Sequence, residues 1–299
     1  MDQTTAIILA TSLAIIMLGM GLSLVADDFK RIFSQPKAIV IGLTNQLILL
    51  PTLAFILVFL FPLQPEIAVG IMILAACPGG ATSNLISHLA IADTALSVTL
   101  TAFSSLITIL TIPFIVNFSL EQFMDQSNMI QLDVLQTFLQ ILIIIIIPIS
   151  IGMIIKKYKK PFALKMEKPV RIASALLLIL VIIGIILKEK ENLISSFKEA
   201  GAIIISLNII AMLVGYYSGK LLKVTSKRSL SIAIESGIQN GTLGITVAVV
   251  LLQNSSFAIV SALYGVMMLF TAAVIVYIGI HKHKKINYSN YIQQLRLQT

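Results

Sequence analysis

The chain alternates long apolar runs with short polar connections along almost its whole length. Each run can cross the ~30 Å hydrocarbon core of a bilayer as a helix, which takes about 20 residues. The pattern predicts an all-α polytopic membrane protein with nine transmembrane helices. The nine expected spans are residues 5–25, 36–61, 66–91, 94–118, 131–155, 169–187, 200–222, 227–253 and 255–280.

Composition and charge agree with a membrane protein and predict its orientation. The mean hydropathy is +0.99, and charged residues make up 11% of the 299 residues, against about 25% in a soluble domain. The net charge of +8 does not indicate a nucleic-acid partner, because the basic residues lie in the connections and form no basic face. With the N-terminus outside, 18 of the 21 Lys and Arg residues fall on the inner side. We therefore expect a multi-pass protein of the cell (inner or plasma) membrane with a cytoplasmic C-terminus.

Two of the runs are interrupted near their midpoints by residues that end helices. Residues 77–84 read Cys-Pro-Gly-Gly-Ala-Thr-Ser-Asn, and residues 234–243 read Ile-Glu-Ser-Gly-Ile-Gln-Asn-Gly-Thr-Leu. The two runs have opposite directions and lie five spans apart, which is typical of inverted repeats of five helices when the first helix is missing. We expect a single transporter unit with a first repeat at about 5–118 (four spans) and a second at about 131–280 (five spans). Matching interruptions in oppositely directed halves indicate the binding site of a secondary transporter; the alternative is a coincidence of two Gly-containing spans.

Oxygen-bearing side chains gather around both interruptions. Glu235 is expected to face a partner, because a carboxylate near the bilayer centre costs about 3 kcal/mol. Neutral oxygens around one carboxylate suit a hard monovalent cation, and one Cys with three scattered His residues gives no ligand set for a transition metal. Ser97 and Thr101 share one helix face, although each hydroxyl can instead bond to its own helix. Gln46 is equally a candidate ligand or a helix–helix hydrogen bond.

Motifs along the chain resemble those of the bile acid:sodium symporter family over about residues 15–280. They are Gly19-Met-Gly-Leu-Ser-Leu, Asp28-Phe-Lys-Arg, Pro65-Glu-Ile-Ala-Val-Gly, Cys77-Pro-Gly-Gly-Ala-Thr-Ser-Asn, Ala95-Leu-Ser-Val-Thr-Leu-Thr and Glu235-Ser-Gly-Ile-Gln-Asn. The resemblance implies a panel domain and a core domain, with two discontinuous helices that cross in the core. It also implies uptake of an organic anion coupled to two sodium ions.

The same resemblance implies a role for individual residues. One sodium ion would be held by Ser83, Asn84, Ser97, Thr101 and Glu235. The second would be held by Gln46, Glu235, Gln239 and the backbone carbonyls of Ser236 and Ile238. Substrate contacts are implied at Ala81, Thr82, Asn240, Gly241 and Thr242.

The chain departs from the family pattern at two places on the substrate side. The more usual order after the glycine pair is Thr-Ala-Ser-Asn, whereas this chain has Ala81-Thr82-Ser83-Asn84. Bacterial members often carry a polar pair in the last span, where this chain has the apolar Met268-Leu269. Nine spans, with the opening helix absent, resemble the animal branch of the family.

The function expected from these features is sodium-driven import of an organic anion, such as a bile acid or a small carboxylate like pantoate, by alternating access. A proton-coupled or cation-exchanging transporter of the same architecture is the first alternative. An ion channel would not need a carboxylate among two broken helices, and an intramembrane enzyme would need a nucleophile with a base, or a metal set, at one depth. The basic tail 281–299 is expected to be a cytoplasmic stop signal, with a possible lipid contact through Lys282, Lys284 and Lys285. The sequence leaves the oligomeric state open.

Overall fold

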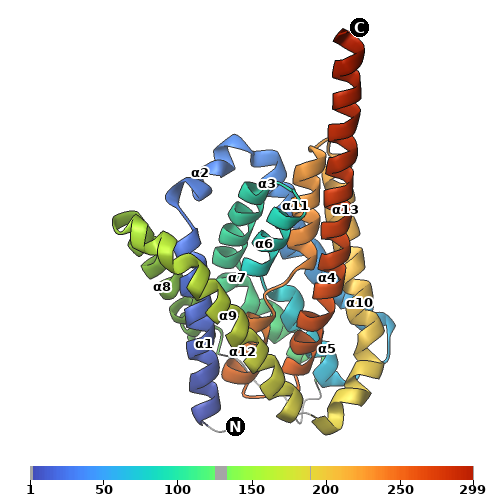
Figure 1. Ribbon diagram of the computed structural model, residues 1–299. Coiled ribbons are helices and arrows are strands. Elements are labelled where there is room, and N and C mark those ends of the chain that lie inside the picture. Colours follow the sequence, from blue (N-terminus) through green and yellow to red (C-terminus); the bar gives the residue numbers. More distant parts are fainter. Residues whose placement is uncertain (1–2, 125–132, 189, 299) are drawn as a thin grey trace.

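The computed structural model describes residues 3–124, 133–188 and 190–298, which form helices joined by short connections (Figure 1). The elements, with η for a π-helix, are α1 (Gln3–Ser23), α2 (Ala26–Ser34), α3 (Pro36–Thr44), η1 (Asn45–Leu49), α4 (Leu50–Leu60), α5 (Pro65–Ala76), α6 (Ala81–Leu89), α7 (Thr94–Phe123), α8 (Val134–Tyr158), α9 (Lys160–Lys188), α10 (Lys190–Leu221), α11 (Ser226–Gly237), α12 (Gly241–Thr246), η3 (Val247–Leu251) and α13 (Ala258–Gln298).

The expected all-α membrane architecture is confirmed at this coarse level. Five helices of the described residues are long and apolar enough to cross a membrane, or six if the bent pair α1 and α2 counts as one span. Shorter apolar helices cover Pro65–Ala76 and Gly241–Leu251. The count of nine spans and the repeat boundaries stay predictions, and the first residues of the expected fifth span, 131–132, lie outside the described residues.

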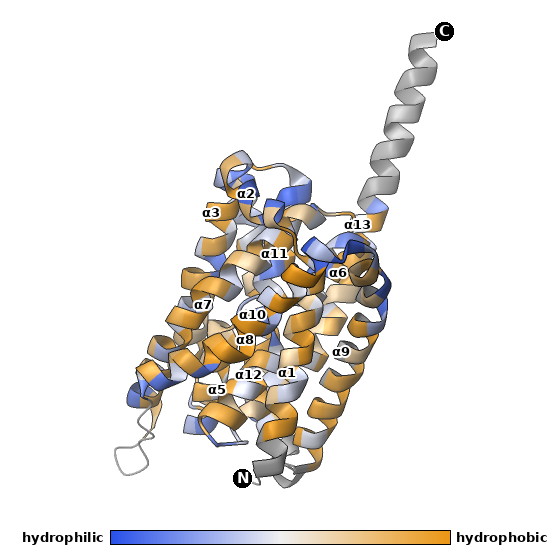
Figure 2. Cartoon of the chain, turned by 90° about the vertical axis from the view of Figure 1, so that its left-hand side faces the viewer, coloured by the Kyte–Doolittle hydropathy of each residue, from blue (hydrophilic) through white to orange (hydrophobic). Residues whose placement is uncertain are grey.

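The side of the molecule is apolar, as a protein embedded in lipid requires. Large hydrophobic side chains such as Phe59, Phe114, Leu180 and Phe270 are exposed. Figure 2 shows that hydrophobic residues dominate the lateral face of the helices, whereas the hydrophilic ones gather at their ends and inside. A soluble protein would bury such side chains, so these residues mark the face turned to the hydrocarbon.

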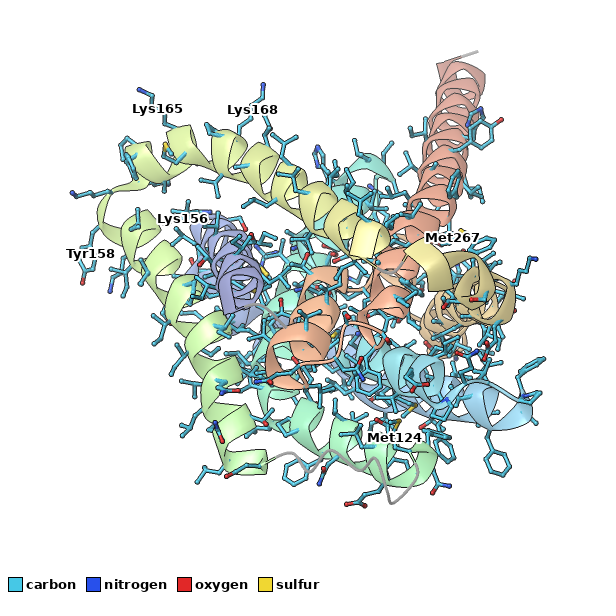
Figure 3. All side chains as sticks on the ribbon, turned by 90° about the horizontal axis from the view of Figure 1, so that it is seen from below. Met124, Lys156, Tyr158, Lys165, Lys168 and Met267 are labelled. Carbon is cyan, nitrogen blue, oxygen red and sulfur yellow. The ribbon has the colours of Figure 1, made fainter. Side chains whose placement is uncertain are left out.

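Three helices, α1, α8 and α9, pack mainly on one another and form a layer at one side of the bundle (Figures 1 and 3). Glycines allow the closest approach within it. A Cβ atom on Gly21 would lie 2.2 Å from the carbonyl oxygen of Ile149, and one on Gly152 would lie 2.6 Å from that of Leu18. Small residues at such crossings let two membrane helices meet backbone to backbone. We call α1, α8 and α9 the three-helix layer.

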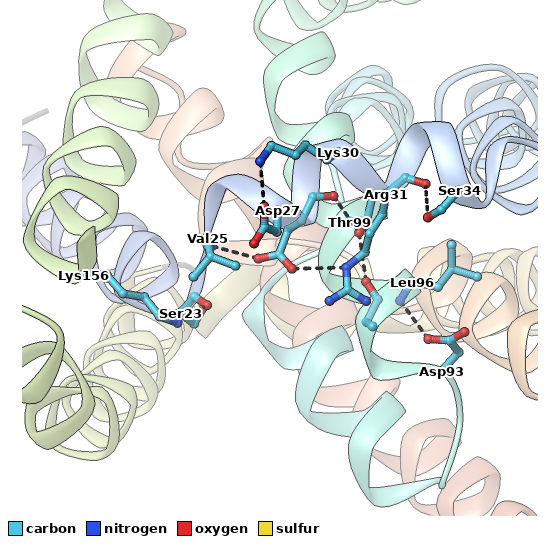
Figure 4. Close-up of polar contacts among 12 residues, drawn as sticks. Ser23, Val25, Asp27, Lys30, Arg31, Ser34, Asp93, Leu96, Thr99 and Lys156 are labelled. Atoms are coloured by element: carbon cyan, nitrogen blue, oxygen red, sulfur yellow. Dashed lines mark hydrogen bonds and ion pairs between the residues drawn. The ribbon is translucent and has the colours of Figure 1, made fainter.

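The segment expected to be a plain connection after the first span is the amphipathic helix α2. It turns by 64° from α1, and its first turn is held by Asp28, which accepts a hydrogen bond from the Val25 amide at 2.8 Å and lies 3.5 Å from Arg31 Nε (Figure 4). Thr99 of α7 donates to the Asp28 carbonyl at 3.0 Å. Helix α2 therefore links the three-helix layer to the rest of the bundle with defined contacts rather than a loose loop.

Two further helix ends differ from the expected boundaries. Helix α9 begins at Lys160 rather than at 169, because Pro161 is tolerated in a first helical turn, and Pro169 lies inside the helix instead of starting it. Helix α13 continues past 280 to Gln298, since no Gly or Pro follows Gly279 to end it. The side chains of Lys282, Lys284 and Lys285 lie outside the described part of the chain, so their expected lipid contact stays a prediction.

Candidate functional site

The two interrupted spans meet at their interruptions. Helix α5 ends at Ala76 and α6 begins at Ala81, while α11 ends at Gly237 and α12 begins at Gly241. Gly79 forms an isolated antiparallel bridge with Gln239, and the Asn240 amide donates to the Pro78 carbonyl at 2.9 Å. Each break therefore supplies backbone partners to the other, which lowers the cost of interrupting helices away from water.

Five oxygen-bearing residues from three helices surround one point beside this crossing. Glu235 Oε2 accepts hydrogen bonds from Ser83 Oγ at 2.7 Å and from Ser97 Oγ at 3.1 Å, and Glu235 Oε1 accepts one from Thr101 Oγ1 at 2.5 Å. Asn84 Oδ1 lies 2.9 Å from Ser97 Oγ and 3.2 Å from Thr101 Oγ1. We call Ser83, Asn84, Ser97, Thr101 and Glu235 the oxygen cluster. The structure thus brings together every residue expected around the first sodium ion.

The oxygen cluster has more lone pairs than hydroxyl protons. The hydroxyls of Ser83, Ser97 and Thr101 supply three protons, whereas the Glu235 carboxylate offers about four lone pairs and Asn84 Oδ1 about two. The carbonyl oxygens of Gly80 and Ser97 also lie near these hydroxyls, but each already accepts a backbone amide. A hydroxyl donates one proton at a time, so lone pairs remain unmatched. A hard cation uses such lone pairs as ligands.

Glu235 is buried, with 1% of its surface exposed, and no Lys, Arg or His nitrogen of the described residues lies within 4.0 Å of its carboxylate. A buried carboxylate without a basic partner is costly in any protein interior and more so in a membrane. Groups of three or more His, Cys, Asp or Glu residues fit for a metal are absent from the described part of the chain. The donor set of the oxygen cluster is therefore one carboxylate with neutral oxygens, which suits a monovalent hard cation.

Gly79 makes room for the carboxylate. A Cβ atom at this position would lie 2.1 Å from Glu235 Oε1, far inside contact distance. At the neighbouring Gly80 the nearest atom to a Cβ would be Asn240 Cα, at an ordinary 3.6 Å. Only the first glycine of the pair is thus required by the packing of Glu235.

A pair of amide side chains lies next to the backbone of Glu235, where Gln239 Nε2 is 3.4 Å from the Glu235 carbonyl oxygen. Gln46 Nε2 donates to the Cys77 carbonyl at 2.8 Å and to Gln239 Oε1 at 2.7 Å. Gln239 Nε2 donates to the Ser236 carbonyl at 2.8 Å, and the backbone of Ile238 lies in the same break, buried. The residues expected around the second sodium ion thus lie together, with Gln46 bonded between helices as the alternative interpretation allowed. We call Gln46 and Gln239 the amide pair.

A π-helix turns Gln46 inward. In η1 the Leu50 amide donates to the carbonyl of Asn45, five residues back. Pro51 lacks an N–H and cannot continue the ordinary ladder, and a widened turn just before it accommodates this loss. Gln46 is consequently buried at 2% exposure although it lies in a span whose other face meets lipid.

Two residues that the sequence analysis did not single out hold the second break. The Gly237 carbonyl accepts hydrogen bonds from Tyr264 Oη at 2.7 Å and from Asn208 Nδ2 at 2.8 Å. Asn208 Nδ2 also lies 2.9 Å from Tyr264 Oη. Asn208 interrupts an apolar run, as Gln46 does, and this polar residue within a span was the signal available in the sequence.

The residues expected to contact substrate differ in accessibility. Ala81 is exposed and Thr82 partly exposed at the start of α6, whereas Gly241 and Thr242 are buried. Asn240 is 7% exposed, and its side chain caps α12 by accepting a hydrogen bond from the Leu243 amide at 3.1 Å. The structure therefore leaves the substrate roles of these residues as predictions and gives Asn240 a structural role in addition.

Comparison with known proteins agrees with this geometry. The sequence profile of the Sodium Bile acid symporter family matches residues 10–197. The chain is 34% identical to the uncharacterized sodium-dependent transporter YocS of Bacillus subtilis over 85% of this chain and 77% of that protein. It is 30% identical to a probable chloroplastic sodium/metabolite cotransporter of Arabidopsis thaliana, over 79% of this chain and 57% of that protein. It is 28% identical to the ileal sodium/bile acid cotransporter of Oryctolagus cuniculus, over 80% of this chain and 68% of that protein.

The matched region includes α1 to α9 and with them the first break and most of the oxygen cluster, and the match to the Bacillus subtilis transporter covers 85% of the chain. The three relatives are named as a sodium-dependent transporter or as sodium cotransporters, and none as an enzyme. With two broken helices crossing at a buried carboxylate, this chain belongs to the sodium bile acid symporter family of membrane transporters.

Proposed function

We propose that the protein imports an organic anion together with sodium ions by alternating access. The observation that carries the proposal is Glu235, a buried carboxylate without a basic partner among the described residues, in a cluster with more lone pairs than hydroxyl protons. A bound sodium ion would neutralise the carboxylate and take up the unmatched lone pairs. The names of the relatives agree with sodium as the coupling ion.

Two sodium ions are proposed, one in the oxygen cluster and one between the amide pair and the second break. The second ion would be held by Gln46, Glu235, Gln239 and the backbone carbonyls of Ser236 and Ile238, and it would take the place that the Gln239 amide nitrogen has at the Ser236 carbonyl. Two sodium ions beside one carboxylate leave one net positive charge. This charge and the amide ends of the broken helices would attract a carboxylate or sulfonate.

The anion would bind at the accessible start of α6, at Ala81 and Thr82, and near Asn240, Gly241 and Thr242. Rocking of the three-helix layer against the remaining helices would expose this region to either side. With the N-terminus outside and the C-terminus cytoplasmic, import of two sodium ions with a monovalent anion moves one charge inward. That charge contributes about 2.3 kcal/mol for each 100 mV of membrane potential.

The proposal is tested by uptake in proteoliposomes under an inward sodium gradient. The substrate is chosen beforehand by a screen of organic anions, from bile acids to pantoate and other small carboxylates, for thermal stabilisation that requires sodium. We expect uptake that stops when sodium is replaced by potassium and that rises with an inside-negative potential. Equal uptake in potassium would refute sodium coupling.

Proton coupling is a second candidate, because a carboxylate surrounded by hydroxyl groups can also be neutralised by a proton. A proton on one Glu235 oxygen would leave lone pairs of the other Glu235 oxygen and of Asn84 Oδ1 unmatched, which favours sodium. Uptake driven by a pH gradient without sodium would establish the proton mechanism. Uptake driven by a sodium gradient at equal pH on both sides would show that transport does not require a proton gradient.

A further inference from the structure

A groove of about 350 Å³ lies between α10, α11, α13 and the end of α6, apart from the site described above. Its walls are mostly apolar and include Met212, Leu213, Leu230, Ile275 and Ile278. None of the residues expected to bind sodium or substrate lines it. We call this cavity the α10–α13 groove.

The floor of the groove is a close backbone contact. A Cβ atom on Gly279 of α13 would lie 2.2 Å from the Ala90 carbonyl oxygen, so the helix passes directly over the end of α6. The chain then turns away at Ile91, whose φ of 56° is left-handed and ends the helix. Both Ala90 and Gly279 line the groove. The groove is therefore formed by the fold itself and does not depend on one movable side chain.

One end of the groove is basic. Lys227 and Ser226 line it, and Lys220 Nζ donates to Ser226 Oγ at 2.7 Å and lies 5.9 Å from the centre of the Tyr216 ring. Within the described ranges, neither lysine has a carboxylate oxygen within 4.0 Å. Arg228, by contrast, is 3.3 Å from Asp93. Two positive charges thus remain uncompensated at the mouth of an apolar groove.

We propose that the α10–α13 groove binds an anionic phospholipid, with an acyl chain along the apolar walls and the phosphate beside Lys220 and Lys227. Leu213, Tyr217 and Ile278, which line the groove, are 49%, 58% and 52% exposed, and in a membrane this exposure is toward lipid. The volume lies in the range of ligand pockets. Basic pockets between membrane helices bind anionic headgroups, and tyrosines are frequent at that depth.

The groove also touches the second break through Met212. This side chain lines the groove and covers Gly237, where a Cβ atom would lie 2.3 Å from Met212 Cγ. An acyl chain packed on Met212 would support α11 next to the break. We therefore expect the bound lipid to raise the thermal stability of the protein.

The test is the thermal stability of the full chain in a neutral detergent during titration with phosphatidylglycerol or phosphatidylcholine. We expect phosphatidylglycerol to stabilise at lower concentration than phosphatidylcholine. The double variant Lys220→Gln/Lys227→Gln should raise the half-saturating concentration of phosphatidylglycerol by about fivefold for each lysine. The matched control is Lys165→Gln/Lys168→Gln on α9, two exposed lysines away from the groove (Figure 3), and it should leave that concentration unchanged.

A second variant tests the apolar part of the groove. Ile278→Trp adds bulk at a partly exposed wall position, so it should fold and should weaken phosphatidylglycerol binding without removing a charge. Equal effects of the two lipids, or an equal loss in the α9 control, would overturn the proposal. The proposal would also be overturned by two results found together: inorganic phosphate stabilises the protein as well as the lipid does, and the Ile278→Trp variant binds phosphatidylglycerol normally. The groove would then bind a free anion.

Discussion

The oxygen cluster includes the Glu235 carboxylate and the amide pair lies at the Glu235 backbone carbonyl, yet the two groups satisfy their polar atoms differently. In the amide pair, Gln46 and Gln239 supply N–H groups to each other and to nearby carbonyls. In the oxygen cluster, three hydroxyl protons face about six lone pairs, those of the charged Glu235 carboxylate and of Asn84 Oδ1. The amide pair can thus close on itself, whereas the oxygen cluster needs a positive charge. Removal of groups from the oxygen cluster should therefore disturb sodium dependence more than removal of groups from the amide pair.

The largest effect is expected for Glu235→Gln. This change removes the charge and keeps an oxygen, so sodium-dependent thermal stabilisation and sodium-driven uptake should both be lost. The loss of a charged ligand corresponds to about 3 kcal/mol or more of ion binding. The measurement is the melting temperature in detergent with sodium against potassium. Glu121→Gln, at an exposed position of α7, is the control and should behave as the wild type. If sodium still stabilises the Glu235→Gln variant, Glu235 is not a sodium ligand.

The second-largest effect on sodium-dependent stability is expected from Gly79→Ala. Its methyl group would lie 2.1 Å from the Glu235 carboxylate, which must move away from the three hydroxyls. We expect about 1–3 kcal/mol of destabilisation and a weaker response to sodium. Gly80→Ala is the matched control, since its methyl group meets only ordinary contacts. Equal effects of the two alanines on sodium-dependent melting would contradict the packing described for Gly79.

A smaller effect is expected from Gln46→Ala. The variant loses the two hydrogen bonds that Gln46 donates, to Cys77 and Gln239, at about 1 kcal/mol each, and a longer one that it accepts from Gln239 Nε2 at 3.4 Å. It should reduce the steepness of the sodium dependence of uptake and retain stabilisation by sodium through the oxygen cluster. Gln136→Ala, at an exposed position of α8, serves as the control. If Gln46→Ala abolished the sodium response as fully as Glu235→Gln, the proposed difference between the two regions would be wrong.

The smallest effect on sodium is expected at Asn240. Because its side chain caps α12, alanine would mix a capping loss of about 1 kcal/mol with any loss of substrate. Asn240→Ser keeps a capping oxygen and removes the amide. We expect the half-saturating concentration of the organic anion to rise severalfold while sodium-dependent melting stays near that of the wild type. If the affinity for the anion in uptake assays is unchanged in this variant, Asn240 does not contact the substrate.

Much of the site could be predicted from the sequence, because the residues that cause the two breaks act locally. Pro78 and the glycines beside it, and Gly237 with Gly241, lie in apolar runs where their effect on a helix is local. Oxygen-bearing side chains also gather beside these residues, so Ser83, Asn84 and Glu235 stood out against the apolar runs. Asn208 and Tyr264 were not predicted as site residues, because their role is to donate hydrogen bonds to the Gly237 carbonyl, which is distant from both in the sequence.

The sequence by itself determined that the chain is membrane-embedded, where two of its helices break and which side chains there carry oxygen. These properties can be read from segments of about 20 residues, because the length and hydrophobicity of a segment decide whether it can span the bilayer. Only the tertiary structure decided that Glu235 lies against Gly79, that Gln46 meets Gln239 and that lysines edge an apolar groove. Such contacts depend on how helices far apart in the chain pack, and hydropathy carries no information about that geometry.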